Sequence, residues 1–333
     1  MNNSSNPLIS VRLVTYNHEK YIEEAIYSIL KQTFTDYELI IVNDGSTDQT
    51  DTIIKQILKR ENNSKIKYIY QENQGVGSAF NTGILNAKGK YIADMSGDDV
   101  CYPQRLEKQV KFIEETKAKI VFSWVDIIDD HGNISLNHPM TKLFNQPHRN
   151  RIDILKYFFY RANYFNCPTG IIQRQLLINV GLYCLTSIQL QDFEMWLRIA
   201  VNHDIYMLPE KLIKYRIRAN NLNLSAPNAD TEKRMTFELI QIYRHFFDNF
   251  SMYLFKEVFG NEIRVKNFTD SIHYELEKAF IYLSHRSNFI KSIGIEKLYY
   301  LCQDESILKV AKSDYNFGLP ELFELTKMKH LAR

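Results

Sequence analysis

The sequence predicts an α/β fold with a mostly parallel sheet, followed by a helical extension at the carboxyl end. Short apolar runs alternate with amphipathic segments in the first part of the chain, which is typical of βαβ units. The run Leu39–Val42 is apolar at every position, as expected of a parallel strand buried on both faces. From Asp230 onwards the pattern is helical and rich in aromatic residues.

The elements follow one another in a regular order. Strands are predicted where apolar runs end in turn residues, over residues 9–14, 39–42, 66–70, 91–93, 120–127 and 205–217. Helices are predicted where apolar residues recur every three to four positions, over residues 18–31, 49–59, 78–87, 103–115 and 192–201. A strand leading into a short helix is predicted from residue 167, and a loop over residues 137–151, which are polar and contain two prolines. We therefore expect two domains, residues 1–229 and residues 230–333.

Composition excludes several classes of protein. The formal net charge of the 333 residues is +2, so the charge of the whole chain does not indicate binding to nucleic acid. The four cysteines form no CxxC pair, which fits a reducing compartment. We find neither a signal peptide nor an apolar run of the ~18 residues that span a membrane. The expectation is a cytoplasmic protein, with peripheral contact at the inner face of the cell membrane compatible with the sequence.

Two adjacent carboxylates, Asp98 and Asp99, follow the apolar run that begins at Tyr91. They stand where a predicted strand stops, which in an open α/β sheet is the edge that binds ligands. Adjacent carboxylates repel one another unless a cation or a donor separates them. Hard oxygen ligands suit Mg²⁺ or Mn²⁺, and such ions usually also hold substrate phosphates. The alternative is a solvated acidic turn before the next helix.

Two nucleotide-binding motifs are excluded. A dinucleotide fingerprint requires G-x-G-x-x-G, but Phe80 stands where the third glycine belongs after Gly75 and Gly77. A P-loop requires Ser or Thr after Gly-Lys, but Tyr91 follows Lys90. An acidic ligand edge takes a nucleotide diphosphate through a bridging cation, so the residues favour a metal–nucleotide site.

Four segments together resemble family 2 of the glycosyltransferases. They are VTYNHEKYIEEAI, IIVNDGSTDQT, NTGILNAKGKYIA and SGDD followed by PQRLEKQ. The resemblance covers roughly residues 8–218 and implies the GT-A fold, a Rossmann-like sheet that binds nucleotide-diphospho-sugars, in residues 1–229. It also implies transfer of a sugar with inversion at the anomeric carbon. Bacterial surface-polysaccharide, O-antigen or capsule synthesis is the setting that the resemblance favours.

The resemblance implies a role for each loop at the strand ends. Thr15, Tyr16 and Asn17 would line the pocket for the base. Asp44 would accept a hydrogen bond from N3–H of uracil or thymine, because a carboxylate suits a base with a donor at that edge. An Asx turn before a helix is the structural alternative for Asp44.

The phosphate-binding part of the family pattern is modified here. Asp98 matches the metal-binding end of the family's Asp-x-Asp signature, and Asp99 would make an outer contact or touch the sugar. Ser96 replaces the first acid of that signature, which removes a charge and should weaken metal binding. Phe80 stands where many members have Arg before Asn81. Arg218 stands where His is commoner, and it could neutralise the diphosphate directly.

Asp192, in the segment QDFEMW, matches the catalytic base of the family, with Gln191 in place of the usual Glu. In an inverting transfer this carboxylate takes the proton of the acceptor hydroxyl. The structural alternative is that Asp192 caps the helix that contains Trp196. A low pKa is expected for a carboxylate at a helix N-terminus.

The predicted function is transfer of a sugar from a nucleotide-sugar donor, UDP- or dTDP-linked, to a saccharide or lipid-linked saccharide acceptor. A nucleotidyltransferase of related fold and a catalytically inactive sugar-nucleotide-binding scaffold are the alternatives. The helical region is compatible with binding an acceptor lipid, a partner subunit or a second copy in a homo-oligomer. The basic end, KMKHLAR, is compatible with an anionic membrane surface and equally with a solvated chain end.

Overall fold

The computed structural model describes residues 6–219, 223–224, 226 and 228–327. The chain forms two compact units, one of Met1–Arg151 with Asn163–Glu232 and one of Ile152–Ala162 with Lys233–Arg333. The main boundary lies close to the predicted one after residue 229. The segment Ile152–Ala162 differs from the prediction, because it belongs to the second unit although its sequence position places it within residues 1–229.

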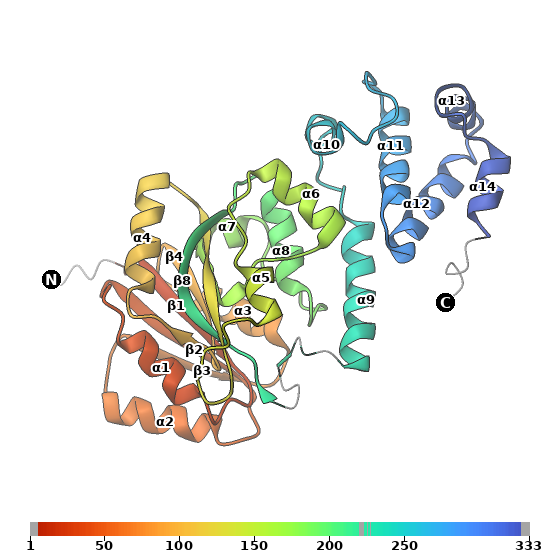
Figure 1. Cartoon of the computed structure of the whole chain (residues 1–333). Helices are drawn as coiled ribbons and strands as arrows, with labels where there is room; N and C mark the ends of the chain where they lie inside the picture. Colours follow the sequence, from red (N-terminus) through yellow and green to blue (C-terminus); the bar gives the residue numbers. More distant parts are fainter. Residues whose placement is uncertain (1–5, 220–222, 225, 227, 328–333) are drawn as a thin grey trace. The chain divides into compact units, whose positions relative to one another are not determined.

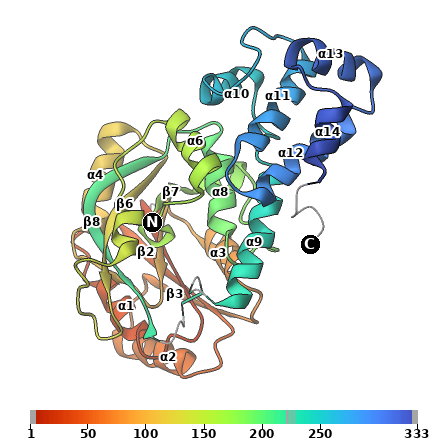
Figure 2. The same cartoon turned by 45° about the vertical axis from the view of Figure 1, so that its right-hand side comes forward.

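An eight-stranded sheet forms the centre of the first unit (Figures 1 and 2). In spatial order the strands are β3 (Ile66–Gln71), β2 (Tyr37–Asp44), β1 (Ile9–Thr15), β4 (Tyr91–Ser96), β7 (Ile171–Gln173), β6 (Ile120–Ile128), β8 (Tyr206–Arg216) and β5 (Val100–Cys101). Strands β3, β2, β1 and β4 are mutually parallel, as are β6 and β8. The short β7 is antiparallel to both of its neighbours. The predicted α/β class with a mostly parallel sheet is confirmed.

Helices cover both faces of this sheet (Figure 1). On one face, α1 (Ile22–Leu30), α2 (Thr50–Glu61) and α4 (Arg105–Thr116) share a core with alternate residues of β1, β2, β4 and β6. On the other face, α3 (Val76–Asn86) reaches the sheet at Gly83, where a Cβ would lie 2.6 Å from the Arg12 side chain. There too α8 (Gln191–Ala200) places the buried Trp196 against Phe122 of β6.

Several elements differ from the sequence prediction. A helix, α5 (Pro139–Phe144), lies within the segment predicted as a loop, and α6 (Arg151–Arg161) follows it. The predicted strand over residues 91–93 extends to Ser96 as β4. Apolar patterning stops at Asp94, but this carboxylate pairs with Arg12 on β1, directly opposite in the strand register. A buried partner thus allows a charged residue to continue a central strand.

The second unit is built around an aromatic core. Phe159 of α6 packs against Tyr243, Phe247, Phe259 and Tyr282. The helices that supply these residues and extend the unit are α9 (Ala229–Arg244), α10 (Met252–Phe259), α11 (Ser271–Ser284), α12 (Asn288–Leu301), α13 (Glu305–Tyr315) and α14 (Leu319–Leu325). The predicted helical character of this region is therefore confirmed over the described residues.

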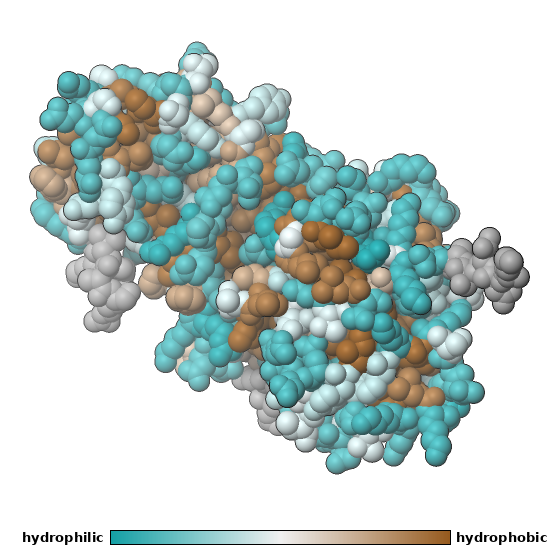
Figure 3. Space-filling view, turned by 180° about the vertical axis from the view of Figure 1, so that it is seen from behind, coloured by the Kyte–Doolittle hydropathy of each residue, from teal (hydrophilic) through white to brown (hydrophobic). Residues whose placement is uncertain are grey.

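The surface is mixed in character. On the face drawn in Figure 3, apolar residues gather in several patches between polar ones. Of the helices that the structure describes, none has the length and apolar character needed to cross a membrane. Residues 328–333, most of the basic end that the sequence offers for membrane contact, lie outside the described residues.

Candidate active site

The carboxyl ends of β1, β2 and β4 meet at one edge of the sheet. The strand register pairs Thr15 with Asn43 and Val14 with Ser96. The turns after these strands therefore come together, and they carry Asn17, Asp44 and Asp98. Parallel strands with aligned ends explain why segments that are separate in sequence share one edge.

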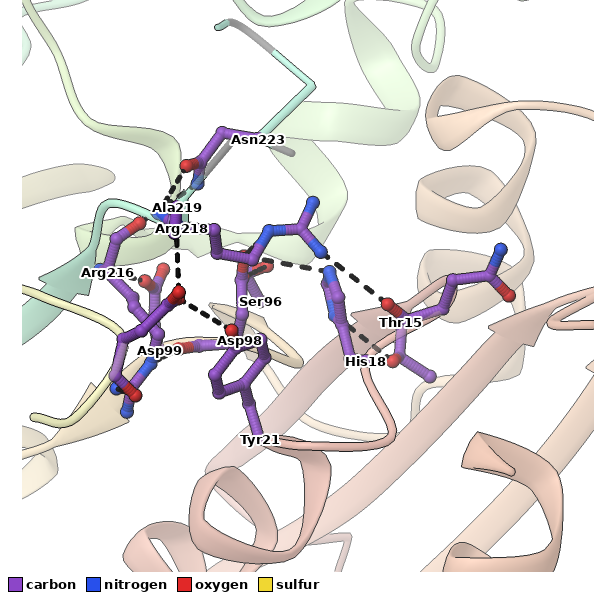
Figure 4. A network of polar contacts seen from close by, with 12 residues as sticks. Thr15, His18, Tyr21, Ser96, Asp98, Asp99, Arg216, Arg218, Ala219 and Asn223 are labelled. Carbon is purple, nitrogen blue, oxygen red and sulfur yellow. Dashed lines mark hydrogen bonds and ion pairs between the residues drawn. The ribbon is translucent and has the colours of Figure 1, made fainter. Parts of the chain in front are cut away.

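Asp98 is buried at this edge beside the His18 imidazole and the Arg218 guanidinium. His18 Nε2 lies 3.6 Å and Arg218 Nε 3.3 Å from Asp98 Oδ2, and Ser96 donates its hydroxyl to Oδ1 at 2.5 Å. Figure 4 shows these side chains converging from the turn after β1, from the end of β4 with the turn that follows it, and from the segment after β8. Burial by itself raises the pKa of Asp98, but His18, Arg218 and the Ser96 hydrogen bond together hold it below its usual value. Asp98 is therefore the ionised member of the acid pair.

Asp99 has a different environment. It is 1% exposed, and its Oδ1 accepts a hydrogen bond from the backbone N–H of Arg216 at 2.8 Å. Arg216 Nε in turn donates to the Asp98 backbone oxygen at 2.8 Å. Burial, and then the neighbouring Asp98 charge, raise the pKa of Asp99 well above its usual value. Asp99 thus connects the acidic turn to the end of β8 through a hydrogen bond that is shielded from solvent.

A glycine allows the acidic turn to lie against the end of β1. A Cβ on Gly97 would stand 2.5 Å from Thr15 Oγ1 and 2.7 Å from His18 Nδ1. Thr15 Oγ1 is itself 3.2 Å from His18 Nδ1, which leaves Nε2 to face Asp98. Sequence reasoning missed both His18 and Arg216. His18 stands directly after the Thr15–Asn17 turn, which was a usable signal, whereas the role of Arg216 depends on long-range contacts.

The first turn presents Tyr16 and Asn17 at the same edge. Tyr16 is 43% exposed, so its ring is available to a ligand. Asn17 adopts a left-handed φ of 55°, which Asn tolerates better than most residues. Its backbone N–H donates to Ser46 Oγ at 3.0 Å, which connects the turn after β1 to the turn after β2.

The carboxylate of Asp44 accepts three hydrogen bonds from other residues of the chain. Oδ1 accepts hydrogen bonds from Gln71 Nε2 at 2.7 Å and from the Gln74 N–H at 3.0 Å, and Oδ2 accepts one from the Gly75 N–H at 2.9 Å. An ionised carboxylate has about four acceptor positions. One position on Oδ2 therefore remains for a further donor. The Asx turn that the sequence offered as an alternative for Asp44 is wrong, because the Ser46 N–H donates to Asn43 Oδ1 instead, at 3.0 Å. The contacts of Asp44 are compatible with a role toward a base.

Asp192 is the second residue of α8, whose N-cap is Leu190. The capping role that the sequence offered as the structural alternative is wrong, because Asp192 lies inside the helix, where its Oδ1 accepts from the Phe193 N–H at 2.6 Å. The predicted low pKa is also wrong. Burial raises the pKa of Asp192 to about 7, against the opposing effect of its hydrogen bonds. Desolvation of the charged form outweighs the favourable helix terminus.

A buried ion pair lies deeper in the sheet. Arg12 Nη2 and Asp94 Oδ1 are 2.5 Å apart, and both side chains are almost completely inaccessible. Cys167 Sγ lies 3.8 Å from Asp94 Oδ2, and both Asp94 and Asp192 raise the pKa of this thiol, although burial is the largest cause. Cys167 therefore lies next to Asp94 and near enough to Asp192 for both carboxylates to affect its thiol. Sequence reasoning missed this pair, whose signal was one charge inside each of two apolar runs.

We expect that removing one partner of the Arg12–Asp94 ion pair lowers the free energy of unfolding much more than removing one partner of a surface ion pair. Arg12→Leu should lower the free energy of unfolding by about 3–5 kcal/mol, because it leaves the Asp94 charge buried and unpaired. The double variant Arg12→Leu/Asp94→Leu should cost less than the sum of the two single changes. Urea denaturation measures all three values.

The exposed pair of Arg60 and Glu23 provides the matched control, since its atoms lie 2.7 Å apart and both side chains are 56% exposed. Arg60→Leu should cost at most ~1 kcal/mol. Equal costs for Arg12→Leu and Arg60→Leu would contradict the account of the buried pair.

Known proteins resemble this chain in sequence. The family model described as glycosyl transferase family 2 matches residues 10–180. An uncharacterized glycosyltransferase of Rickettsia prowazekii (strain Madrid E) is 35% identical over 228 residues, which cover 68% of this chain and 69% of that protein. An uncharacterized glycosyltransferase of Methanocaldococcus jannaschii is 36% identical over 216 residues, which cover 63% of this chain and 71% of that protein.

Solved structures resemble this chain in fold. Residues 1–349 of S. aureus TarS, in complex with UDP-GlcNAc, match with a TM-score of 0.57 and 20% identity, over 91% of this chain and 83% of that one. A mannosyltransferase from Pyrobaculum calidifontis, in complex with GDP-Man and Mn²⁺, matches with a TM-score of 0.55 and 16% identity, over 97% of this chain and 84% of that one. At these identities the similarity concerns the fold.

Proposed function

The chain belongs to glycosyl transferase family 2, and on that basis we propose that it transfers a sugar from a UDP- or dTDP-sugar, with inversion, to a hydroxyl of a glycan or lipid-linked acceptor. One observation carries the proposal. The first unit holds an ionised carboxylate, Asp98, beside His18 and the cationic Arg218, and a second carboxylate, Asp192, with a pKa of about 7. The first suits a diphosphate site and the second suits proton transfer near neutral pH.

In the proposed reaction Asp192 is the general base. It takes the proton of the acceptor hydroxyl while that oxygen forms a bond to the anomeric carbon. The bond from this carbon to the diphosphate oxygen breaks on the opposite side, and the nucleoside diphosphate leaves with the electron pair. A pKa near the working pH is the best compromise for a base, since the group is ionised often enough and still holds a proton well.

Asp98 is the proposed ligand of Mg²⁺ or Mn²⁺. Among the described residues there is no group of three or more His, Cys, Asp and Glu side chains arranged to hold a metal ion. Asp98 with His18 Nε2 still fits such an ion, because these metals commonly take only one or two protein ligands and complete their shell with water and substrate phosphate. A bound metal would neutralise charge on the leaving diphosphate. Arg218 would share this task, since its guanidinium already lies beside Asp98.

Asp44 is the residue proposed to recognise the base, by accepting a hydrogen bond from its N3–H at the position left on Oδ2. Asp44→Ala should weaken binding of UDP or dTDP about 10-fold or more, because a lost hydrogen bond to a charged group costs ~1.5–3 kcal/mol. Calorimetry with UDP, dTDP, GDP and CDP measures this loss. The change also releases Gln74 and Gly75, so the informative quantity is the preference for UDP over GDP, which should fall. Wild-type protein that binds GDP or CDP more tightly than UDP and dTDP would contradict this role.

A donor screen tests the function as a whole. The full chain is incubated with UDP-, dTDP- and GDP-sugars and with saccharide and lipid-linked acceptors, and release of nucleoside diphosphate is measured. Release from a UDP- or dTDP-sugar that depends on an acceptor would support the proposal. Binding of these donors without turnover under every condition would instead favour an inactive scaffold. Synthesis of a surface polysaccharide in the cytoplasm is the proposed setting, and the four free cysteines are compatible with it.

A further inference from the structure

The side chain of Asn163 is held in one orientation by its own turn. Its Oδ1 accepts a hydrogen bond from the Phe165 N–H at 2.9 Å, and its Nδ2 lies 3.3 Å from the Phe165 backbone oxygen. This arrangement turns the Nδ2 donor toward Asp192, whose Oδ2 it reaches at 3.1 Å. The reversed amide would place oxygen against carboxylate oxygen and NH₂ against N–H, which is unfavourable at both ends.

The backbone before Asn163 is unusual. Ala162 adopts a left-handed φ of 65°, a conformation that costs a non-glycine residue roughly 1–2 kcal/mol. At Asn163 the chain returns from Ile152–Ala162, a segment of the second unit, to the first unit. The strained residue and the turn that follows it thus place one amide donor directly on the Asp192 carboxylate.

Asp192 has few other polar neighbours. Its Oδ1 is held by the Phe193 N–H at 2.6 Å. The titratable group that faces it from another element is the Cys167 thiol, whose own pKa it raises. On its own helix, Glu194 and Arg198 pair with each other at 2.6 Å. Among the described residues, Asn163 is therefore the side chain that donates to Asp192, and no cationic group contacts this carboxylate.

We propose that Asn163 is a positioning residue for sugar transfer: its amide donates to Asp192 Oδ2, fixes the plane of the carboxylate and favours its ionised form over the protonated one. The inference rests on the proposed role of Asp192 as the base. It assigns Asn163 a task in the reaction that no family motif in this chain predicts.

The proposal predicts the direction in which the pH profile of kcat shifts when the Asn163 donor is removed. Burial raises the pKa of Asp192 to about 7, and the Asn163 hydrogen bond opposes that rise. The ionised carboxylate is the active form, so kcat should increase with pH through this pKa. Removing the donor raises the pKa further, which moves the acidic limb of the kcat profile to higher pH and restores kcat when the pH is raised.

Asn163→Asp is the sharpest variant. The new carboxylate still accepts from the Phe165 N–H, so the turn is retained, but a second acidic group now faces Asp192 in place of a donor. The acidic limb of the kcat–pH profile should move to higher pH by about one unit or more. At a pH on this limb, kcat should then be about tenfold lower than that of the wild type. The KM for the donor should stay near the wild-type value. Asn163→Ala should shift the limb in the same direction by a smaller amount.

Asn63→Asp is the matched control. Asn63 Oδ1 accepts from the Lys65 N–H at 3.0 Å, so it has the same kind of turn on an exposed loop before β3 and gains the same charge. Its kcat profile should coincide with that of the wild type. An Asn163→Asp profile that also coincides, or a loss of kcat that is equal at every pH, would overturn the proposal. Failure of both Asn163 variants to fold would overturn it too, because the residue would then serve stability alone.

Asp192→Asn separates this inference from the proposed function. If Asp192→Asn keeps wild-type kcat, the base assignment fails and the Asn163 inference fails with it. If Asp192→Asn loses activity while Asn163→Asp keeps the wild-type pH profile, the base stands and the Asn163 inference alone is wrong.

Discussion

Replacing Asp192 by Asn should lower kcat by ~10²-fold or more, because the amide cannot take the proton of the acceptor hydroxyl. The side chain keeps nearly the same volume, but one amide cannot accept both hydrogen bonds that now reach the carboxylate, from the Phe193 N–H and from Asn163. One hydrogen bond to the side chain is lost, while the free-energy cost of burying a charge disappears. Thermal stability and donor binding should therefore change little. The measurement is kcat with a confirmed donor and acceptor.

Asp51→Asn is the control for this substitution. Asp51 is the second residue of α2, as Asp192 is of α8, but it bonds Lys55 and Tyr68 and takes no part in the proposed site. Its kcat should equal that of the wild type. If Asp192→Asn stays within a few-fold of wild-type kcat, Asp192 is not the base, and Glu194 becomes the next residue to test.

Replacing Asp98 by Ala should abolish nearly all transfer. Asp98 is the carboxylate around which His18, Arg218 and Ser96 converge, so the variant loses the proposed metal ligand and the anion that positions His18 and Arg218. EDTA should likewise silence the wild type, and added Mg²⁺ or Mn²⁺ should restore it. Activity is followed as release of nucleoside diphosphate.

Asp126→Ala is the control, because Asp126 is also a largely buried acid with a cationic partner, Lys211, at 2.7 Å. It should retain activity. Undiminished transfer by Asp98→Ala, together with full wild-type activity in EDTA, would refute the metal role. Partial activity of the wild type in EDTA would indicate that Arg218 carries part of the diphosphate charge, and Arg218→Ala should then remove that remainder.

Local patterns in the sequence were sufficient to predict most of the helices and strands of the first unit. Strand β2 follows from an unbroken apolar run, and β8 from the extended segment over residues 205–217. The helices α5 and α6 were not predicted. Strand β4 was predicted too short, because a pattern of apolar residues cannot reveal that Asp94 has a buried partner on β1.

The sequence by itself determined the α/β class, the family, and the order of the turns that carry Asn17, Asp44 and Asp98. These properties depend on local patterning and on motifs within short segments. Parallel strands then bring the turns to one edge wherever the register aligns their ends.

Only the tertiary structure decided how the site residues are charged and held. Asp98 and Asp99 are adjacent in sequence, yet the pKa of one is lowered and that of the other raised, because different side chains surround them. The raised pKa of Asp192 arises from burial, and the contacts of Asn163 with Asp192 and of Arg218 with Asp98 join segments far apart in the chain. Desolvation and long-range electrostatics depend on the environment of a group in three dimensions, which no local pattern contains.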